Sequence, residues 1–491
     1  MNSTLTRITI VLLLCTSLTA VRAGNNAIKA SVLRVKVTAQ AYDTMRPWQK
    51  RPPSKRETFG VVVGPGQILT SAVLVANATL VGVERIDDYS EATAQVECVD
   101  YVSNLALITI ADDEFNKRLK PVKVAKKVAE GKSVKAYQFE ANGTVQVTEG
   151  RIKTVETGTY AMGLGAFLVY RVSAELRLGN TGLVPFFRRG SLAGLMVGYR
   201  DESRTASLIP GPVIRHFLDD WREDELYDGF PRVGFGYAPI KAPQIRRYVG
   251  LEEGEGGIYV TYIRPGSPAD RGGLKKGDVL LGIAGFPIDR HAQYDDPDYG
   301  NIGIAHLIST RFKCEDKVLF EILRDGNRET LEVRLFARSP HDWPIEPIMF
   351  DRQPKYLVSA GVIYRELSRD LLRAWGKDWQ TKAPRRLTRY ERKQWKLLKP
   401  GEKVVVVFGI LPSPLTIGYE GIRFTIVKTI NGQPVTSLKN VAAAMKKPLD
   451  GFNVIAFENP SAPEIVLKSD QMQQVDDFIR KRYRLQQLSH L

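Results

Sequence analysis

The chain has 491 residues, which at typical domain sizes of about 100 to 200 residues predicts several domains. A hydrophobic fraction of 43% and a charged fraction of 25% exclude a disordered or collagen-like chain. The 70 Lys and Arg residues against 54 Asp and Glu residues leave a net charge of +16, which favours anionic partners or surfaces without naming one. Five His and three Cys residues leave little room for metal chemistry, and we expect no cofactor.

The five histidines are unevenly distributed along the chain. They occur at positions 216, 291, 306, 341 and 490, so the first 215 residues contain none. Because imidazole is the commonest general base for a hydroxyl nucleophile, this absence constrains any catalytic site in the N-terminal part of the chain.

The N-terminus, residues 1–23, has the pattern of a secretory signal peptide. Arg7 precedes an apolar run from Ile8 to Leu14, and the small residue Ala23 is placed for cleavage. The run is shorter than the roughly 18 to 20 apolar residues of a membrane-spanning helix. We therefore expect an exported product, in the periplasm or outside the cell, with a retained N-terminal anchor as the alternative.

Short β-rich segments dominate the first part of the chain. An alternating apolar pattern predicts a strand over Ser31–Val37, and short strands broken by Gly, Asn and Asp continue from Phe59 to about Ile209. Regular short strands without a long helical pattern are typical of a pair of β-barrels or a sandwich. A predicted helix, Val213–Trp221, follows Pro210 and marks a domain boundary.

Two further units follow this helix, one over about 229–337 and one over 356–467 with a helix at about 470–483. Residues 365–403 carry 13 Lys or Arg against 5 Asp or Glu, interleaved with four aromatic residues. Such a mixture binds anionic polymers through charge and stacking, or forms an amphipathic helical insertion whose aromatic side chains pack inward. The second interpretation is favoured, because no phosphate-binding glycine loop or zinc-ligand cluster accompanies the segment.

Three segments of the first domain carry a family resemblance. They read TFGVVVGPGQILTSAVLV, SNLALITI and LGNTGLVPFFRRGSLAGLMVG. They are similar to the His, Asp and Ser motifs of the Deg/HtrA trypsin-like serine proteases, which read approximately GSGFVI-ILTNAHVV, DLALLKV and GNSGGP. The His position falls on Val73, the Asp position on Asn104 and the Ser position on Thr181. The resemblance implies a trypsin-like double β-barrel whose catalytic triad is degenerate.

These three replacements remove the chemistry of the triad. A hydroxyl becomes a nucleophile when a neighbouring base takes its proton and a carboxylate holds that base in place. Val73 has no proton-accepting side-chain atom, and Asn104 lacks the negative charge. The resemblance places a residual oxyanion hole at Gly179, Asn180 and Thr181, whose backbone donors need no particular side chain. A hole without a nucleophile and a base does not make a peptidase.

The resemblance continues into the second unit. The segment IYVTYIRPGSPADRGGLKKGDVLLGIAGFPI resembles the core of a PDZ domain, which binds a peptide as an added strand at a sheet edge. The resemblance places the carboxylate-binding loop and the opposing side-chain pocket at seven residues: Val233, Gly234, Phe235, Gly236, Ile304, Leu307 and Ile308. Plain core packing is the alternative for the last three. Residues 289–300, rich in Asp and Tyr, are a candidate lid.

The third unit resembles the divergent C-terminal PDZ-like domain of plant-type Deg proteases through LVSAGVIYRELS, ILPSPLTIGYEG and IVKTINGQPVTSLKNVAAAMKK. No usual carboxylate loop is evident in it, and we interpret it as structural. The expected fold is multidomain and mainly β, with a trypsin-like double β-barrel, a PDZ domain and a second, divergent PDZ-like α+β domain. The expected boundaries are 1–23 for the signal peptide, 24–212 for the protease-homology domain, 213–228 for the linker helix, 229–340 for the PDZ domain and 341–491 for the second PDZ-like domain.

The leading hypothesis is an exported pseudoprotease that binds peptides or protein C-termini through its PDZ domain and acts as a scaffold, chaperone or regulator. The resemblance implies a homo-oligomer, trimeric or multiple, or co-assembly with an active Deg protease. One alternative is an ATP-independent serine-type endopeptidase of protein quality control that keeps low activity through Thr181. The other is a binder of anionic polymer through residues 365–403, although nucleic acid is not the expected partner.

Overall fold

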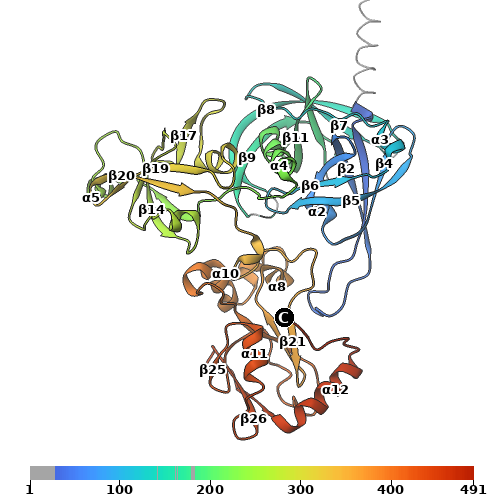
Figure 1. Ribbon diagram of the computed structural model, residues 1–491, viewed down its shortest axis with the longest axis vertical. Helices are drawn as coiled ribbons and strands as arrows, with labels where there is room; N and C mark the ends of the chain where they lie inside the picture. The colour runs from blue at the N-terminus through green and yellow to red at the C-terminus, as the bar shows by residue number, and fades with distance from the viewer. Residues whose placement is uncertain (1–27, 141, 161, 163, 178–182) are drawn as a thin grey trace, which may run out of the picture. The chain divides into compact units, whose positions relative to one another are not determined.

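The computed structural model describes residues 28–140, 142–160, 162, 164–177 and 183–491 (Figure 1). The chain divides into two compact units. The first contains Ser54–Arg338 and the residues before Gln40, and the second contains Gln40–Pro53 and Ser339–Leu491. The predicted signal peptide lies outside the described residues, and the expected domain boundaries stay predictions.

The N-terminal part of the first unit consists of two closed β-barrels, so the predicted trypsin-like double barrel is confirmed. The first barrel has the strand order β1 (Val32–Ala39), β2 (Ser54–Gly64), β3 (Gln67–Ser71), β6 (Leu105–Thr109), β5 (Glu91–Asp100) and β4 (Ala78–Arg85). The second has the order β10 (Pro185–Arg188), β11 (Ser191–Arg200), β12 (Thr205–Pro210), β9 (Ala166–Ala174), β8 (Val145–Thr159) and β7 (Ser133–Phe139). Branched and aromatic side chains such as Val35, Ile68 and Tyr170 are fully buried, as pleated half-buried strands favour.

Three helices accompany the barrels: α2 (Ala72–Val75), α3 (Asp113–Asn116) and α4 (Gly211–Asp224). The predicted helix Val213–Trp221 lies within α4, which contains a proline in its first turn, where no intrahelical donor is lost. Its apolar side chains, Val213, Ile214, Phe217 and Leu218, are buried, and α4 packs on β11 and β12. The helix therefore completes the core of the second barrel.

The rest of the first unit is a PDZ-like sheet with the order β13 (Phe235–Pro239), β14 (Ile258–Ile263), β15 (Val279–Ile283), β19 (Lys317–Arg324) and β20 (Asn327–Arg334). The short β16 (Phe286–Pro287) pairs with β15, and β17 (Gln293–Asp296) forms a separate hairpin with β18 (Gly300–Gly303). The helical segments are α5 (Pro243–Val249), α6 (Pro268–Arg271), α7 (Ile304–His306) and the π-helical turn η1 (Leu307–Arg311).

The second unit repeats this topology and extends it. Its sheet has the order β27 (Ile465–Lys468), β26 (Phe452–Phe457), β24 (Thr425–Ile430), β23 (Val405–Ile410), β22 (Val362–Glu366), β21 (Tyr356–Ser359) and β28 (Ser489–His490). The short β25 (Gln433–Pro434) pairs with β24, as β16 pairs with β15 in the first sheet. The helical segments are η2 (Pro340–Asp342), α8 (Arg369–Leu372), η3 (Arg373–Trp375), α9 (Trp379–Lys382), α10 (Arg385–Leu397), α11 (Leu438–Ala444), η4 (Ser469–Gln471) and α12 (Met472–Arg482).

The two sheets differ at the edge where a PDZ domain would receive a peptide. Strand β13 is the outermost strand of its sheet, whereas β22, its topological equivalent, pairs with β21, which in turn pairs with β28. Helix α11 contacts both β21 and β22. The chain itself therefore fills the peptide position of the second sheet, which fits the interpretation of this domain as structural.

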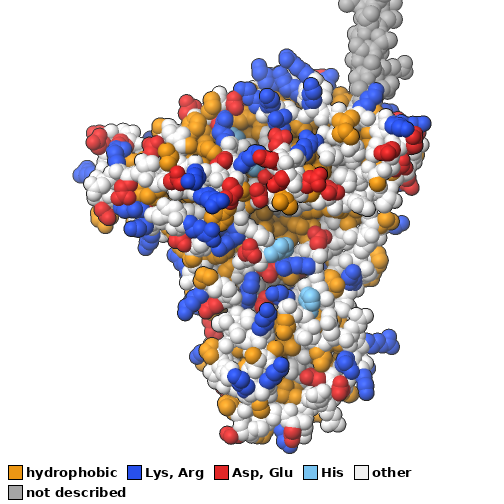
Figure 2. Space-filling model, viewed as in Figure 1, with side chains coloured by type: hydrophobic (Ala, Val, Ile, Leu, Met, Phe, Trp, Pro, Cys, Tyr) orange, Lys and Arg blue, Asp and Glu red, His pale blue; other side chains and the backbone are white. Residues whose placement is uncertain are grey.

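The basic segment 365–403 forms α8, η3, α9 and α10 within the second unit. Its aromatic side chains pack inward: Trp379 is buried, and the ring of Trp375 lies edge-on against Phe424 with centroids 4.6 Å apart. Lys and Arg side chains lie among Asp and Glu over much of the face shown in Figure 2. The aromatic residues therefore stabilise the fold and do not present a stacking surface. Among the described residues, no helix is both long and apolar enough to cross a membrane.

Candidate functional site

The first barrel brings two of the three triad positions together. Val73 lies in the one-turn helix α2, and Asn104 lies in the turn before β6 with its side chain directed at α2. The Asn104 Oδ1 atom accepts hydrogen bonds from the Val73 backbone N–H, at 3.1 Å, and from the Ser71 hydroxyl, at 2.9 Å. Asn104 is only 7% exposed. The amide therefore holds the start of α2 in place, and its oxygen is already engaged with neutral donors.

A residue that the motif comparison did not single out also contacts position 73. The Arg56 guanidinium donates from Nη1 to the carbonyl oxygens of Val73, at 3.0 Å, and Ala76, at 3.3 Å. These carbonyls belong to the end of α2, where helix geometry leaves acceptors unpaired. The basic composition of the preceding loop was visible in the sequence, but nothing local indicated that Arg56 would satisfy this helix end.

The third triad position, Thr181, lies outside the described residues, as do Gly179 and Asn180 of the expected oxyanion hole. The chain is described again from Leu183, whose side chain is 4% exposed in the hydrophobic core. The Leu183 backbone N–H donates to the Thr58 hydroxyl at 2.9 Å. Leu183, which the resemblance aligns with the last glycine of GNSGGP, is thus held inside the barrel. The oxyanion hole stays a prediction.

Histidine side chains form no hydrogen bond with the described part of the predicted site, at Val73 and Asn104. His216, the first histidine of the chain, is on α4, with its ring stacked on Phe230 at a centroid distance of 4.5 Å. Burial lowers the pKa of His216, so the ring is neutral at pH 7. Among the described residues, no imidazole hydrogen-bonds to Ser71, Val73 or Asn104. His216 is therefore a packing residue and does not replace the missing base.

The predicted carboxylate loop of the first PDZ-like sheet has a defined geometry. Val233 is buried, and its carbonyl oxygen accepts from the Ala269 N–H at 3.0 Å. Gly234 has φ of +83°, and its carbonyl accepts from the Arg264 N–H at 2.9 Å. Phe235 and Gly236 follow, half-buried, at the start of the edge strand β13. The loop therefore ends where an added peptide strand would begin.

Gly234 is needed at this place for two physical reasons, and Gly234→Ala is expected to destabilise the first unit by about 1–3 kcal/mol. A positive φ is strained for alanine, and a Cβ here would lie 2.5 Å from the Ser267 Cβ. Urea unfolding measures the effect. Gly285→Ala is the matched control, because its φ is +77° but nothing lies within 4 Å of the added Cβ. Equal losses in the two variants would remove the contact with Ser267 from this explanation.

The opposing residues Ile304, Leu307 and Ile308 are 6%, 0% and 7% exposed. They belong to a core that is continuous with the second barrel, because α7 packs on β9 and η1 on α4. Phe235 packs against the same core. The structure thus places all four on one apolar cluster beside β13, while leaving little of the three helical side chains exposed, and their role in peptide binding stays a prediction.

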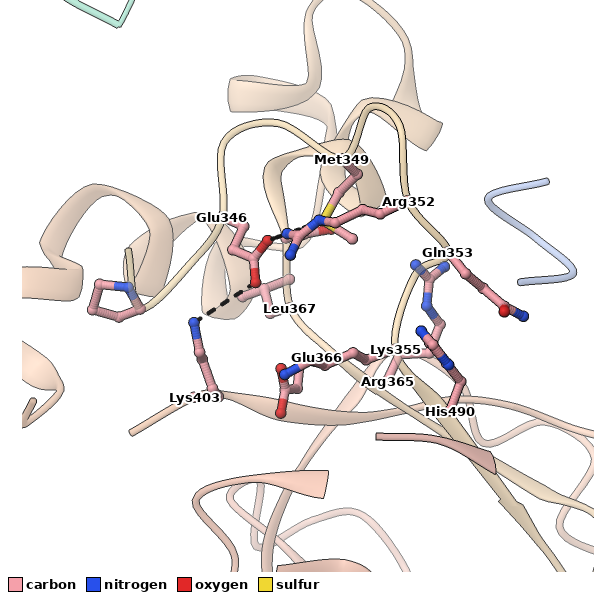
Figure 3. A pocket seen from close by; sticks show the side chains of 12 residues that line it. Glu346, Met349, Arg352, Gln353, Lys355, Arg365, Glu366, Leu367, Lys403 and His490 are labelled. Carbon is pink, nitrogen blue, oxygen red and sulfur yellow. Dashed lines mark hydrogen bonds and ion pairs between the residues drawn. The ribbon is translucent and has the colours of Figure 1, made fainter. Parts of the chain in front are cut away.

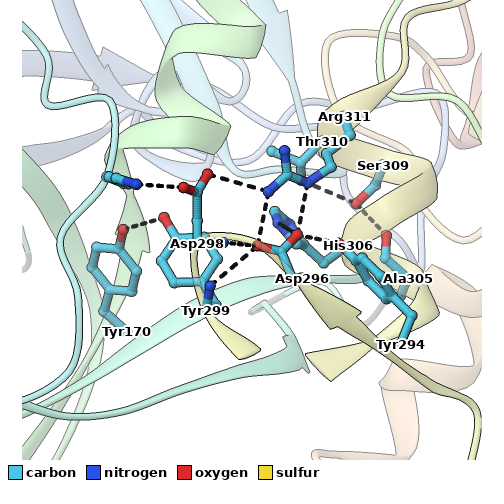
Figure 4. A network of polar contacts seen from close by, with 11 residues as sticks. Tyr170, Tyr294, Asp296, Asp298, Tyr299, Ala305, His306, Ser309, Thr310 and Arg311 are labelled. Carbon is cyan, nitrogen blue, oxygen red and sulfur yellow. Dashed lines mark hydrogen bonds and ion pairs between the residues drawn. The ribbon is translucent and has the colours of Figure 1, made fainter. Parts of the chain in front are cut away.

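The candidate lid, 289–300, contributes to a buried network that ties the PDZ-like sheet to the second barrel (Figure 4). Arg311 donates two hydrogen bonds to the Asp296 carboxylate, at 2.7 and 2.8 Å, and the Tyr294 hydroxyl donates a third at 2.5 Å. The Tyr299 hydroxyl hydrogen-bonds to that of Tyr170 on β9 at 2.8 Å. The β17–β18 hairpin is therefore fastened to the barrel in this structure.

Comparison with known proteins agrees with these observations. Two family models, each described as a PDZ domain, match residues 345–489 and 259–297. Protease Do-like 2, chloroplastic, of Arabidopsis thaliana is 27% identical over 439 residues, which cover 87% of this chain and 70% of that protein. Putative protease Do-like 3, mitochondrial, of the same plant is 25% identical and covers 89% of this chain and 77% of its own length. The chain shares the double barrel and the PDZ domains of the Deg/HtrA proteins.

Other Deg/HtrA proteins resemble it over shorter lengths. The probable periplasmic serine endoprotease DegP-like of Marinomonas sp. is 23% identical and covers 66% of each chain. A variant of the HtrA-type protease AlgW, solved with a decapeptide, superposes with a TM-score of 0.50 at 19% identity. It covers 64% of this chain and 98% of that structure, and it supports the fold alone. At two of the predicted triad positions, the present chain has an amide, Asn104, and an aliphatic residue, Val73.

No group of three or more His, Cys, Asp and Glu residues suited to a metal ion occurs in the part of the chain that the structure describes. The Cys98 thiol is buried, and burial raises its pKa to about 12, so it is not a thiolate nucleophile at neutral pH. The candidate functional features of this unit are therefore the pair at the predicted triad positions, Val73 with Asn104, and the edge strand β13.

Proposed function

We propose that this chain is an exported Deg/HtrA-type pseudoprotease that binds peptide segments or protein C-termini through its first PDZ domain. It acts as a scaffold, chaperone or regulator. The single observation that carries the proposal is the pairing of Asn104 with Val73, because its amide oxygen bonds backbone and hydroxyl donors where a protease needs a charged carboxylate and an imidazole.

Peptide binding is the activity that the remaining site supports. Strand β13 has a paired neighbour, β14, on one side only in the described sheet, so its other edge offers backbone donors and acceptors to an incoming strand. The loop Val233–Gly236 adjoins that edge, and the partly buried Phe235 borders the apolar cluster. A hydrophobic C-terminal side chain is the ligand that this combination would bind.

Titration of the purified chain with fluorescent hydrophobic C-terminal peptides tests this proposal. Phe235→Asp is expected to weaken binding by about tenfold or more, because it places a charge where an apolar side chain would be desolvated. Leu319→Asp is the matched control, since Leu319 is an exposed apolar residue of the same sheet, 51% exposed on β19. Circular dichroism confirms that both variants fold. Equal binding by parent and Phe235→Asp would remove β13 from the proposal.

Export and assembly belong to the same proposal. Cleavage after Ala23 predicts a product that starts at Gly24, which mass spectrometry of the exported protein would identify. A homo-oligomer or a mixed assembly with an active Deg protease is expected, and light scattering coupled to size exclusion measures it. A cell-associated product that retains residues 1–23 would instead support an N-terminal anchor.

A further inference from the structure

The second unit contains a small cavity with an unusual charge balance. The cavity, of about 110 Å³, lies between the segment before β21, the end of β22, the start of β23 and the terminal strand β28 (Figure 3). Its basic lining side chains are Arg352, Lys355, Arg365 and Lys403. Its acidic lining side chains are Glu346 and Glu366, so the cations exceed the carboxylates by two, and His490 adds a fifth basic group.

One of the two carboxylates is already fully engaged. Glu346 pairs with Arg352, and its other oxygen lies 3.8 Å from the Lys403 Nζ atom. Lys403 also donates to the Trp343 carbonyl at 2.7 Å. Burial lowers the pKa of Lys403, and the neighbouring cations Lys355 and Arg352 lower it further, against the opposite effect of Glu366. The lining thus holds more positive charge than its own acids neutralise.

Arg365 is the group that points to a missing partner. The residue is 1% exposed, and its Nη1 donates to the Thr44 carbonyl, yet its Nε has no hydrogen-bond partner among the described residues. The Asp370 and Asp43 carboxylates raise the pKa of Arg365 from a distance, and neither forms an ion pair with it among the described residues. Its guanidinium sits 5.3 Å from the centre of the Phe408 ring, and burial lowers its pKa to about 10. A buried, charged donor left unpaired is costly, and an anion in the cavity would satisfy it.

We propose that this cavity binds a single phosphate group. Two guanidinium groups and two ammonium groups line the cavity with two carboxylates, so a dianion would balance the charge of the lining. The planar donors of arginine match the oxygens of a phosphate. At roughly 30 Å³ for each water in the liquid, the volume corresponds to about three or four waters, so one phosphate fits and a larger group stays outside. The phosphate is either free or the phosphomonoester headgroup of phosphatidic acid.

The position of His490 gives the site a structural consequence. His490 is on β28, where it pairs with Tyr356 of β21, and it lines the cavity together with the segment before β21. A bound phosphate would therefore connect this segment to the terminal strand. Because a ligand that binds only the folded state stabilises it, occupancy is measurable as a rise in the unfolding temperature of the second unit.

Calorimetric and thermal-shift titration of the full chain with inorganic phosphate tests the proposal, with sodium chloride at equal ionic strength as the salt control. Phosphate is expected to bind saturably and to raise the unfolding temperature. Lys355→Gln and Arg365→Lys are each expected to weaken binding about tenfold, since one charged contact or one fork is lost. Lys399→Gln, which removes an exposed lysine outside the lining, is expected to bind as the parent does.

Vesicles of phosphatidylcholine with phosphatidic acid, and of phosphatidylcholine alone, distinguish the two sources of the phosphate. Co-sedimentation with the phosphatidic acid vesicles that is lost in Lys355→Gln, but not in Lys399→Gln, assigns a lipid headgroup. Saturable inorganic phosphate binding without co-sedimentation assigns a free phosphate. The proposal is overturned if phosphate acts no differently from chloride and the vesicles are not bound, or if Lys399→Gln loses as much binding as Lys355→Gln.

Discussion

Labelled casein is expected to stay intact with the purified mature chain and to be cleaved when Val73→His, Asn104→Asp and Thr181→Ser are combined. Loss of a serine-protease triad costs about 10⁶-fold in turnover, and replacing its carboxylate by an amide alone costs about 10⁴-fold. We therefore expect the triple variant to exceed the parent by at least about 10³-fold, with the release of labelled fragments as the measurement.

The geometry at position 104 supports this expectation. The Asn104 Oδ1 atom already accepts from the Val73 N–H, so an aspartate could keep that bond and offer its second oxygen to an imidazole at position 73. The Arg56 guanidinium lies against the Val73 carbonyl, and a nearby cation lowers the pKa of an imidazole. The carboxylate introduced at position 104 raises that pKa in turn, and it holds the ring in the orientation that a general base requires.

Control variants distinguish cleavage by the restored triad from cleavage by a contaminating protease or by an unrecognised base in the parent. The double variant Val73→His with Thr181→Ser lacks the carboxylate and is expected to be much weaker than the triple variant. Cleavage by the parent that disappears in Thr181→Ala would contradict the pseudoprotease proposal and favour the endopeptidase alternative. An inactive triple variant would mean that the substrate cleft or the oxyanion hole is also lost.

Removal of the Asp296 carboxylate, in the buried network between the β17–β18 hairpin and the second barrel, is expected to have the largest effect on stability. Asp296 is 2% exposed, and Asp296→Ala leaves Tyr294 and two backbone donors without this acceptor, while Arg311 keeps only its 3.2 Å contact with Asp298. Breaking a buried charged pair by removing one partner typically costs about 3–5 kcal/mol. Urea unfolding of the full chain measures the loss. Asp295→Ala, in the same hairpin but exposed, is expected to change stability by less than about 0.5 kcal/mol.

The same network predicts a pH dependence. Burial alone would raise the pKa of Asp296, but the His306 imidazole, 3.5 Å from a carboxylate oxygen, and hydrogen bonds from Arg311 and Tyr294 outweigh it and hold that pKa well below its usual range. A lowered folded-state pKa contributes stability that is complete above the unfolded value of about 3.9 and is lost as the pH falls further. The parent is thus expected to lose stability below about pH 4 more steeply than Asp296→Asn. Parallel acid transitions would show that Asp296 is not the group responsible.

The family resemblance and the barrels were predictable from local sequence, and the degenerate triad stays a prediction made from it. The three motifs carry the resemblance, and the absence of histidine before position 216 is a property of composition that no folding can change. The inward packing of aromatic residues in 365–403 was also the favoured interpretation, because no phosphate-binding glycine loop or zinc-ligand cluster accompanies that segment.

Other features could not be derived in this way. Strand β13 lies at the edge of its sheet, whereas β22 pairs with β21. Local sequence patterns do not indicate which distant segments pair as strands, so this difference could not be predicted. The hydrogen-bond partners of Asn104, Arg56 and Leu183 could not be predicted either. Each bond joins residues that are far apart in the chain, and no sequence pattern relates them.

The sequence by itself determined which chemical groups the chain can use, and therefore that an imidazole–carboxylate–hydroxyl triad is missing at positions 73, 104 and 181. Only the tertiary structure decided which polar groups find partners. Tyr170 and Tyr299 meet across 129 positions, and Arg365 reaches Thr44 across 321 while its Nε stays unpaired. The physical reason is that hydrogen-bond and charge balance inside a protein depends on distances in space, which local propensity does not encode.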